Sequence, residues 1–237
     1  MKAQKFLFAA LVVFSGAAMA HAQTVDDIVT KHLAAIGGEA NWKKVNALRM
    51  TGSLTAQGTQ IGVVVTAEEN KGARQDITVS GMSGYAFMTP TQGWTYMPFA
   101  GQQKPEAMTA DQVKEAKDDL DIQGDLVDYR AKGSTVDYLG KEDYQGTECY
   151  KLKLTFKDGN DRTIFIDPTA YYKIREVKKQ KADGKEVEVG TDFSNFQKLP
   201  EGIVVPMTVG TPNGDVTMSK FEVNPAIDES IFAAPAH

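Results

Sequence analysis

Hydrophobic and polar residues alternate with a period of two through most of this chain. In the clearest run, residues 150–156, large apolar side chains occupy one set of alternate positions and lysines and a threonine the other. Successive side chains of a strand point to opposite faces, so the pattern predicts an antiparallel strand with one buried and one wet face.

Similar runs recur along the sequence and are separated by short segments rich in glycine, asparagine, aspartate and proline. We predict further strands at residues 48–56, 61–65, 74–80, 85–88, 94–97, 163–166, 171–179, 186–196, 204–209 and 215–223. Consecutive strands joined by tight turns form a meander. Roughly ten strands are too many for one flat sheet, so the sheet should curl.

The segment before the first strand has helical spacing instead. Apolar residues recur three and four positions apart from Val25 to Ile36, behind Thr24, which is a good N-cap. Gly37-Gly38 favours the end of this helix, because glycine readily adopts the left-handed conformation found there. A short second helical piece is expected at residues 39–45.

A second interruption of the strand pattern lies in mid-chain. Residues 98–107 are predicted as a loop punctuated by glycine and proline. Thr109 can cap a helix that runs to about Ile122, with Val113 and Leu120 on its apolar face. Its opposite face is rich in acidic residues and should be solvated.

The first 22 residues have the three parts of a secretory signal peptide. Two lysines precede a short apolar run at residues 6–14, and small residues follow. This run is shorter than the ~20 residues that span a bilayer, which argues against a membrane anchor. We expect cleavage after Ala22, with Ala20 as the alternative site, and one folded domain over residues 23–237.

Charge and cysteine content narrow the function further. The chain has 26 basic and 31 acidic residues, a formal net charge of −5 that makes nucleic acid an unsuitable partner. The single cysteine, Cys149, cannot form an internal disulfide and is expected to be a buried apolar residue. No cysteine lies near Ala22, where lipid is attached in bacterial lipoproteins. We therefore expect a soluble, unanchored periplasmic protein.

Motifs of common catalytic and cofactor sites are absent from the sequence. It contains no G-x-S-x-G, H-E-x-x-H, P-loop, C-x-x-C or glycine-rich dinucleotide turn, so we expect no cofactor. Asp118, Asp119 and Asp121 lack the glycine and terminal glutamate of a calcium loop, so no metal is expected there. A carboxylate pair among the acidic residues stays open as a hydrolytic alternative.

The dry faces of the strands point to a binding function. A sheet that curls around its apolar face is either filled by its own helix or holds a ligand. Aromatic residues and methionines gather around residues 82–108, and methionine adapts well to acyl chains. We expect the cavity to be lined by Leu54, Val63, Val65, Phe87, Trp94, Tyr96, Leu152, Leu154 and Phe156.

Two segments give the chain a family resemblance. The sequence Gln-Gly-Trp-Thr-Tyr-Met-Pro-Phe at residues 92–99 and the closing segment 228–235, with Phe232 and Pro235, resemble the LolA-type outer-membrane lipoprotein-sorting proteins. The resemblance covers residues 24–235. It implies an incomplete antiparallel β-barrel, mainly β, with an N-terminal helix and a mid-chain helical lid over a hydrophobic cavity.

The resemblance also implies a function. Such proteins shield the acyl chains of lipoproteins in the periplasm, so it implies a carrier that takes cargo from an inner-membrane donor and delivers it to an outer-membrane acceptor. The family's functional arginine lies on an early strand, where Lys71 and Arg74 are the nearest candidates. We therefore predict a monomeric, non-enzymatic carrier of acylated lipoproteins or lipids. The alternatives are an envelope sensor or interaction module and a carboxylate-dependent hydrolase.

Overall fold

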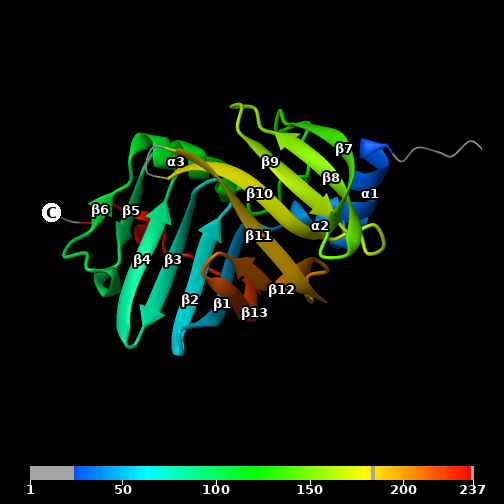
Figure 1. Ribbon diagram of the computed structural model, residues 1–237. Helices are drawn as coiled ribbons and strands as arrows, with labels where there is room; N and C mark the ends of the chain where they lie inside the picture. Colours follow the sequence, from blue (N-terminus) through cyan, green and yellow to red (C-terminus); the bar gives the residue numbers. More distant parts are fainter. Residues whose placement is uncertain (1–23, 183–184, 236–237) are drawn as a thin grey trace, which may run out of the picture.

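The computed structural model describes residues 24–182 and 185–235, in which one antiparallel sheet dominates (Figure 1). The predicted signal peptide and the predicted turn at Asp183-Gly184 lie outside the described residues. The strands are β1 (Ala47–Ala56), β2 (Thr59–Glu68), β3 (Gly72–Val79), β4 (Met82–Met88), β5 (Gly93–Tyr96), β6 (Glu106–Ala107), β7 (Thr135–Tyr144), β8 (Thr147–Thr155), β9 (Asp161–Ile166), β10 (Lys173–Ala182), β11 (Lys185–Lys198), β12 (Val204–Thr211) and β13 (Gly214–Val223).

The strands follow one another in a meander, with one exception. Their order is β6-β5-β4-β3-β2-β1-β13-β12-β11-β10-β9-β8-β7, so β1 pairs with the last strand and the sheet ends at β6 and β7. A twisted sheet of this many strands curls. Because its two ends do not pair, it forms an incomplete barrel, which confirms the predicted fold class.

Irregular pairing accompanies the bend of the sheet. The register shifts between Thr51 and Gly52 where β1 meets β13, and again where β7 meets β8 and where β10 meets β9. An extra residue in one strand locally increases the twist. These shifts could not be predicted from the alternation, which only sets the face of each side chain within a run.

The N-terminal helix forms as predicted. Helix α1 spans Val25–Ala35, and Thr24 and Asp27 form a reciprocal capping box at its start. The short α2 (Glu39–Trp42) follows a glycine pair. Gly37 has φ +103°, and a Cβ atom there would collide with the carbonyl oxygen of Gly202. The turn therefore needs glycine both for its backbone angle and for close approach to the sheet.

The mid-chain helix is shorter than predicted. Helix α3 spans Ala110–Ala116 and continues as the tighter 3₁₀ helix η2 (Lys117–Leu120), so the α-helix does not reach Ile122. Asp119 of η2 forms ion pairs with Arg162 of β9 and Lys178 of β10, which connects this turn to the sheet. The predicted loop at 98–107 contains another 3₁₀ helix, η1 (Pro98–Ala100), and the short strand β6.

The helices cover only part of the concave face. Ile28 and Val29 of α1 pack with Leu152, Leu154 and other side chains of β8 and β9 in one core cluster. Trp42 of α2 belongs to a second cluster, together with residues of β1 and β12. No helix among the described residues is long and apolar enough to cross a membrane.

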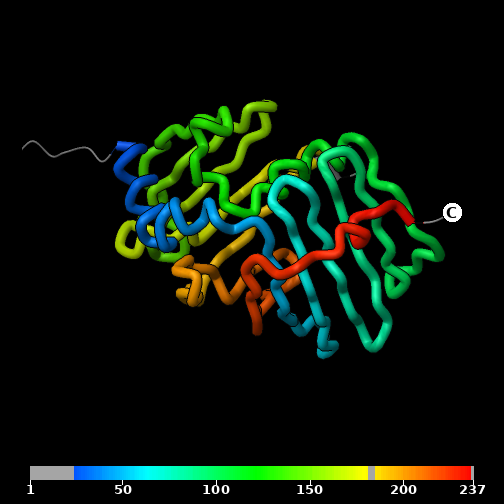
Figure 2. The backbone as a smooth tube through the Cα atoms, turned by 180° about the vertical axis from the view of Figure 1, so that it is seen from behind, coloured from blue at the N-terminus to red at the C-terminus, as the bar shows by residue number. Residues whose placement is uncertain are grey.

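The C-terminal segment crosses the opposite, convex face (Figure 2). Asn224 begins it by accepting hydrogen bonds from the backbone N–H groups of Asn46 and Ala47. The 3₁₀ helix η3 (Glu229–Phe232) then places the Phe232 ring over Gly72, where a Cβ atom would lie 2.9 Å from the ring. The tail is therefore a strap on the outside of β1 to β3.

A matched pair of leucines tests the packing of α1 on the sheet. Leu152 is fully buried beneath α1, whereas Leu139 on the edge strand β7 is 53% exposed. Leu152→Ala should lower the free energy of unfolding by about 2–5 kcal/mol, because it opens a cavity in the core. Leu139→Ala should change it by less than about 0.5 kcal/mol. Equal losses in urea unfolding would contradict the packing described.

Candidate functional site

The register assigns every strand residue to one of two faces. Directly paired residues of antiparallel strands point to the same face. Val63 pairs with Gly52 on β1 and with Ile77 on β3, and Val209 of β12 pairs with Val216 of β13. Following these pairs from strand to strand identifies the concave face along the sheet.

A strip of apolar side chains runs across the concave face from β4 to β11. Its members are joined by direct pairing or by alternation along one strand, and they occupy seven neighbouring strands. We call them the apolar strip: Met82, Val79, Ile77, Ile61, Val63, Val65, Leu54, Met218, Val216, Val209, Val189 and Val187.

The centre of the apolar strip is packed by strand residues alone. Leu54, Val63 and Val216 are its buried core, and the partly buried side chains against them all come from β1, β2 and β13. Its ends are open, since Met82 is 48% and Val187 37% exposed. The strip thus forms an apolar floor. No side chain of α1 or α2 belongs to the cluster around Val63.

The nine predicted lining residues fall into separate places. Leu54, Val63 and Val65 lie together on the apolar strip. Leu152 and Leu154 also face the concave side, but α1 covers them and both are 0% exposed. The two possibilities for a curled sheet, filling by its own helix and space for a ligand, are therefore both present, at opposite ends of the same face.

The aromatic residues of the predicted lining lie elsewhere. Phe87 pairs with Trp94 and with Arg74, and the register puts these side chains on the convex face, opposite Val63. Tyr96 shares that face and packs on Tyr85, with ring centroids 6.0 Å apart. The nine residues therefore do not border one common space, because a strand shift of one residue reverses the face.

Phe156 takes a fourth position. It follows the end of β8 and lines a cleft beside α3, where the Arg162 guanidinium lies 5.0 Å from its ring centroid. A cation at this distance is attracted by the face of the ring. Phe156 is therefore at the edge of the concave face, where it packs against the core cluster of Leu152 and Leu154 and also borders the charged residues of the cleft.

The two basic candidates, Lys71 and Arg74, both contact the C-terminal strap. Lys71 forms ion pairs with Glu68 and with Glu229 of η3. Arg74 stacks on the Tyr85 ring at 4.2 Å and donates a hydrogen bond to the Ile231 carbonyl oxygen at 3.1 Å. Their geometry fixes the tail on the convex face.

A partly open, mainly apolar pocket lies beneath the helices. Its volume is about 190 Å³, below the roughly 300–1,000 Å³ of common ligand pockets, so it has room only for a short apolar group. Apolar residues form most of its wall, and sequence alternation did not identify them, because they come from loops, bulged strands and helix ends. The lining includes Ile36, Trp42, Ile122, Leu126, Val127, Ile164, Phe193, Phe196, Val204 and Pro206.

His32 is a polar member of this pocket wall. Its Nδ1 lies 2.8 Å from the Tyr171 carbonyl oxygen, and since a carbonyl only accepts, Nδ1 carries the proton. Burial lowers the pKa of His32 from 6.5 to about 4, helped by repulsion from Lys173 and opposed by the bond to Tyr171. The ring is therefore neutral at pH 7.

A buried ionic cluster ties the segment after α3 to the sheet. Arg162 on β9 bonds to both carboxylate oxygens of Asp125 at 3.1 Å and to Asp119 at 2.6 Å. Lys173 pairs with Glu176 at 2.6 Å and lies 3.6 Å from Asp125. Charges this deeply buried need such partners, because they have lost their water.

The pKa of Glu176 shows how strongly this cluster favours charged side chains. Burial alone would raise that pKa, but the charges of Lys173 and Arg162 lower it to about 2. Asp119 is exposed, as predicted for the acidic face of this segment, and its carboxylate also bonds to Arg162 and to Lys178 at 2.7 Å.

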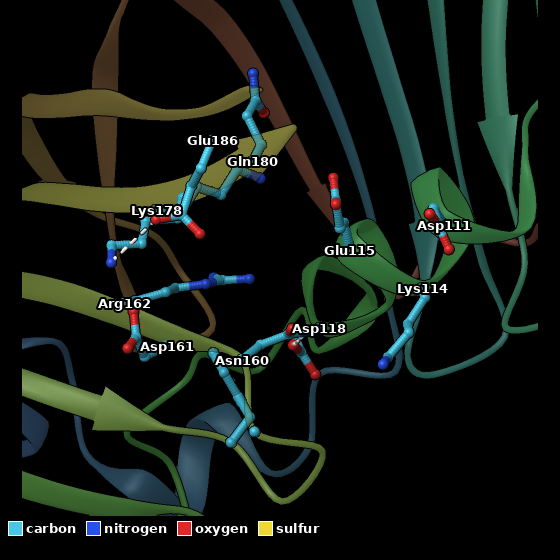
Figure 3. A pocket seen from close by; sticks show the side chains of 13 residues that line it. Asp111, Lys114, Glu115, Asp118, Asn160, Asp161, Arg162, Lys178, Gln180 and Glu186 are labelled. Carbon is cyan, nitrogen blue, oxygen red and sulfur yellow. Dashed lines mark hydrogen bonds and ion pairs between the residues drawn. The ribbon is translucent and has the colours of Figure 1, made fainter. Parts of the chain in front are cut away.

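A charged cleft opens beside this cluster, between α3 and the hairpins of β8 to β11 (Figure 3). Arg162 extends into it from β9, whereas Asp118 and Glu115 enter from the opposite, helical wall. Its volume is about 350 Å³. Four basic and five acidic residues line it: Lys114, Arg162, Lys178, Lys179, Asp111, Glu115, Asp118, Asp161 and Glu186.

The arrangement offers little for metal binding or thiol chemistry. Within residues 24–182 and 185–235, no three His, Cys, Asp or Glu side chains are grouped as metal ligands. Cys149 is 0% exposed, and burial raises the pKa of its thiol, which disfavours the nucleophilic thiolate. The prediction that Cys149 is a buried apolar residue is thereby confirmed.

Comparison with solved structures identifies the fold. The chain is similar to a DUF1329 family protein from Desulfovibrio piger (14% identity, TM-score 0.53, covering 88% of this chain and 97% of that one). It is equally similar to a LolA superfamily protein from Nitrosomonas europaea (14%, 0.53, 87% and 96%). A third match is a putative outer membrane lipoprotein-sorting protein domain from Vibrio parahaemolyticus (13%, 0.50, 87% and 94%).

These likenesses show that the chain has a LolA-like fold, as the resemblance implied. At such low identity they establish the fold and not the cargo. No family model and no curated protein matches the sequence.

The neutral state of His32 predicts a pH dependence. The unfolded chain binds this proton below about pH 6.5 and the folded chain only below about pH 4, so stability falls as pH drops between these values. The loss should approach about 3 kcal/mol. His32→Asn should flatten the curve of unfolding free energy against pH in this window, whereas Thr30→Asn, on the exposed side of α1, should leave it unchanged.

Removing one member of the buried ionic cluster should be costly. Asp125 is only 7% exposed. Arg162→Met removes the main partner of its carboxylate and should lower the unfolding free energy by about 3–5 kcal/mol. The double variant with Asp125→Leu should recover most of this loss in urea unfolding. Lys220→Met, which breaks an exposed pair with Glu222, is the control and should have little effect.

Proposed function

We propose that this protein is a periplasmic carrier that shields acyl chains of lipoproteins or lipids on the concave face of its sheet. It forms one β domain over residues 23–237 and acts by binding, without catalysis. The observation that carries the proposal is the apolar strip. Its apolar side chains extend over seven strands, buried at the centre and exposed at Met82 and Val187, and a continuous apolar surface of this kind is typical of an interaction site.

The energetics favour an acyl chain as the occupant. Each methylene that leaves water contributes about 0.8 kcal/mol, so even a partly covered chain is held by several kcal/mol. The strip extends over seven strands, and its methionines, Met82 and Met218, adapt to a flexible hydrocarbon. The pocket of about 190 Å³ under α1 and α2 is too small for this role by itself.

The fold and the sequence support the same conclusion. The LolA-like fold occurs in a putative outer membrane lipoprotein-sorting protein domain, and the N-terminal residues have the pattern of a signal peptide. A soluble carrier between two membranes needs a donor at the inner membrane and an acceptor at the outer one. We propose both as partners, with the carrier acting as a monomer.

The revised lining follows from the register. Leu54, Val63 and Val65 keep the role predicted for them, joined by strip residues of β3, β11, β12 and β13. Leu152 and Leu154 would become lining only if α1 moved away. Phe87, Trp94 and Tyr96 support the convex face, so we leave them out of the proposed site.

Two neighbouring valines give a controlled test of the proposed site. Val65 lies on the apolar strip, whereas Val64 points to the convex face, and both are half-buried on the same strand. Val65→Gln should weaken binding of a fluorescent fatty acid about tenfold, because a valine side chain contributes ~1.5 kcal/mol or more when buried. Val64→Gln should leave the dissociation constant nearly unchanged.

Binding and cargo should be checked together. Native mass spectrometry of the protein purified from periplasm without detergent should detect bound acyl species or a co-purifying lipoprotein. A chain that stays free of lipid after incubation with vesicles, and whose two valine variants behave alike, would contradict the carrier function. A stable complex with another protein in the absence of lipid would favour the interaction-module alternative instead.

A further inference from the structure

The apolar strip ends beside the charged cleft of Figure 3. On the β10–β11 hairpin, Val187 pairs directly with Gln180 and Val189 with Lys178, so the last valines of the strip adjoin side chains that line the cleft. Glu186 of the cleft is the sequence neighbour of Val187. A molecule that lies along the strip therefore meets a polar, charged compartment at one end.

Basic residues predominate on the sheet wall of the cleft and acidic residues on its helical wall, although Asp161 and Glu186 lie on the sheet and Lys114 lies on α3. The sheet supplies cationic groups, with Arg162 and Lys178 reaching in from β9 and β10, while Asp118 enters from η2 (Figure 3). Its volume, about 350 Å³, lies at the lower end of the roughly 300–1,000 Å³ of ligand pockets. A purely anionic group would meet the acidic wall, and a purely cationic group the basic wall.

Asp118 is the acid that would gain most from a ligand. It accepts a hydrogen bond from the Asn160 side chain at 3.0 Å, and among the described residues no ion pair includes it. Burial raises the pKa of Asp118, and repulsion from Asp158 and Asp119 adds to the effect, while the hydrogen bond from Asn160 and the charge of Arg162 oppose it. Its carboxylate is thus partly desolvated, and Arg162 acts on it without forming a direct ion pair.

We propose that this cleft binds the headgroup of a zwitterionic phospholipid of the phosphoethanolamine type, whose acyl chain lies on the apolar strip. The phosphate is placed toward Arg162 and Lys178, which reach the cleft from the sheet, and the primary ammonium toward Asp118. The inference rests on the proposed carrier function and adds the class of lipid. Charge-assisted hydrogen bonds from the ammonium to a carboxylate are stronger than those between neutral groups.

The chemistry ranks three lipids that share the same acyl chains. Phosphatidylethanolamine offers a phosphate and an N–H donor. Phosphatidylcholine keeps the charges but has no N–H to donate to Asp118. Phosphatidylglycerol lacks the cation altogether and brings a net negative charge toward Asp118, Asp161 and Glu186. We expect uptake in this order.

The experiment offers the protein vesicles with equal amounts of dioleoyl phosphatidylethanolamine and dioleoyl phosphatidylglycerol. Native mass spectrometry then measures the two lipids bound to the full chain purified after export. The wild-type protein should take up phosphatidylethanolamine at least about fivefold over phosphatidylglycerol. Asp118→Asn should reduce this ratio to below about twofold while total lipid binding stays the same, because the strip is intact.

Two further variants complete the test. Lys178→Gln, which removes a cation that would face the phosphate of either lipid, should weaken uptake of both lipids without lowering the ratio, and Asp137→Asn, an exposed acid on β7, should change neither uptake nor ratio. Lipid binding without headgroup preference, or a preference that survives Asp118→Asn in folded protein, would overturn this inference and leave the carrier function standing. Absence of any bound lipid in the wild-type protein would overturn both.

Discussion

The concave face of the sheet is largely apolar apart from the charged side chains of β9 and β10, and the helices of the chain cover only part of it. Helix α1 packs on β8 and β9, and α2 packs on β1 and β12. The part of the face around Val63 is packed by neighbouring strand residues. Because apolar surface exposed to water is unfavourable, this imbalance determines both how the protein folds and what it can bind.

Charge rather than apolar contact holds the segment after α3 in place. Arg162 joins Asp119 and Asp125 to the sheet, and Lys173 and Glu176 complete the buried cluster. An ion pair removed from water contributes little net stability but strongly penalises any arrangement that separates its partners. The cluster therefore fixes where this segment lies, and with it the cleft at the end of the apolar strip.

The nine residues predicted to line a cavity show what the alternation of apolar and polar residues can and cannot predict. Within one strand it correctly separated the two faces, and Leu54, Val63 and Val65 lie on one surface. It could not relate the faces of distant strands, so Phe87 and Trp94 were grouped with side chains that point the other way. Register between strands depends on turns and on bulges such as the one at Thr51 and Gly52, which leave no periodic trace.

By itself, the sequence determined the mainly β architecture, most strand positions, the α1 capping box and the burial of Cys149, because period, capping and composition act over a few neighbouring residues. The LolA-like fold was accessible through short motifs at residues 92–99 and 228–235. Only the tertiary structure decided which strands lie side by side, that α1 covers the concave face at β8 and β9, and that Arg162, Asp118 and Lys178 meet in one cleft. These features join residues far apart in the chain, and their partners are set by packing and solvation of the whole sheet rather than by local preference.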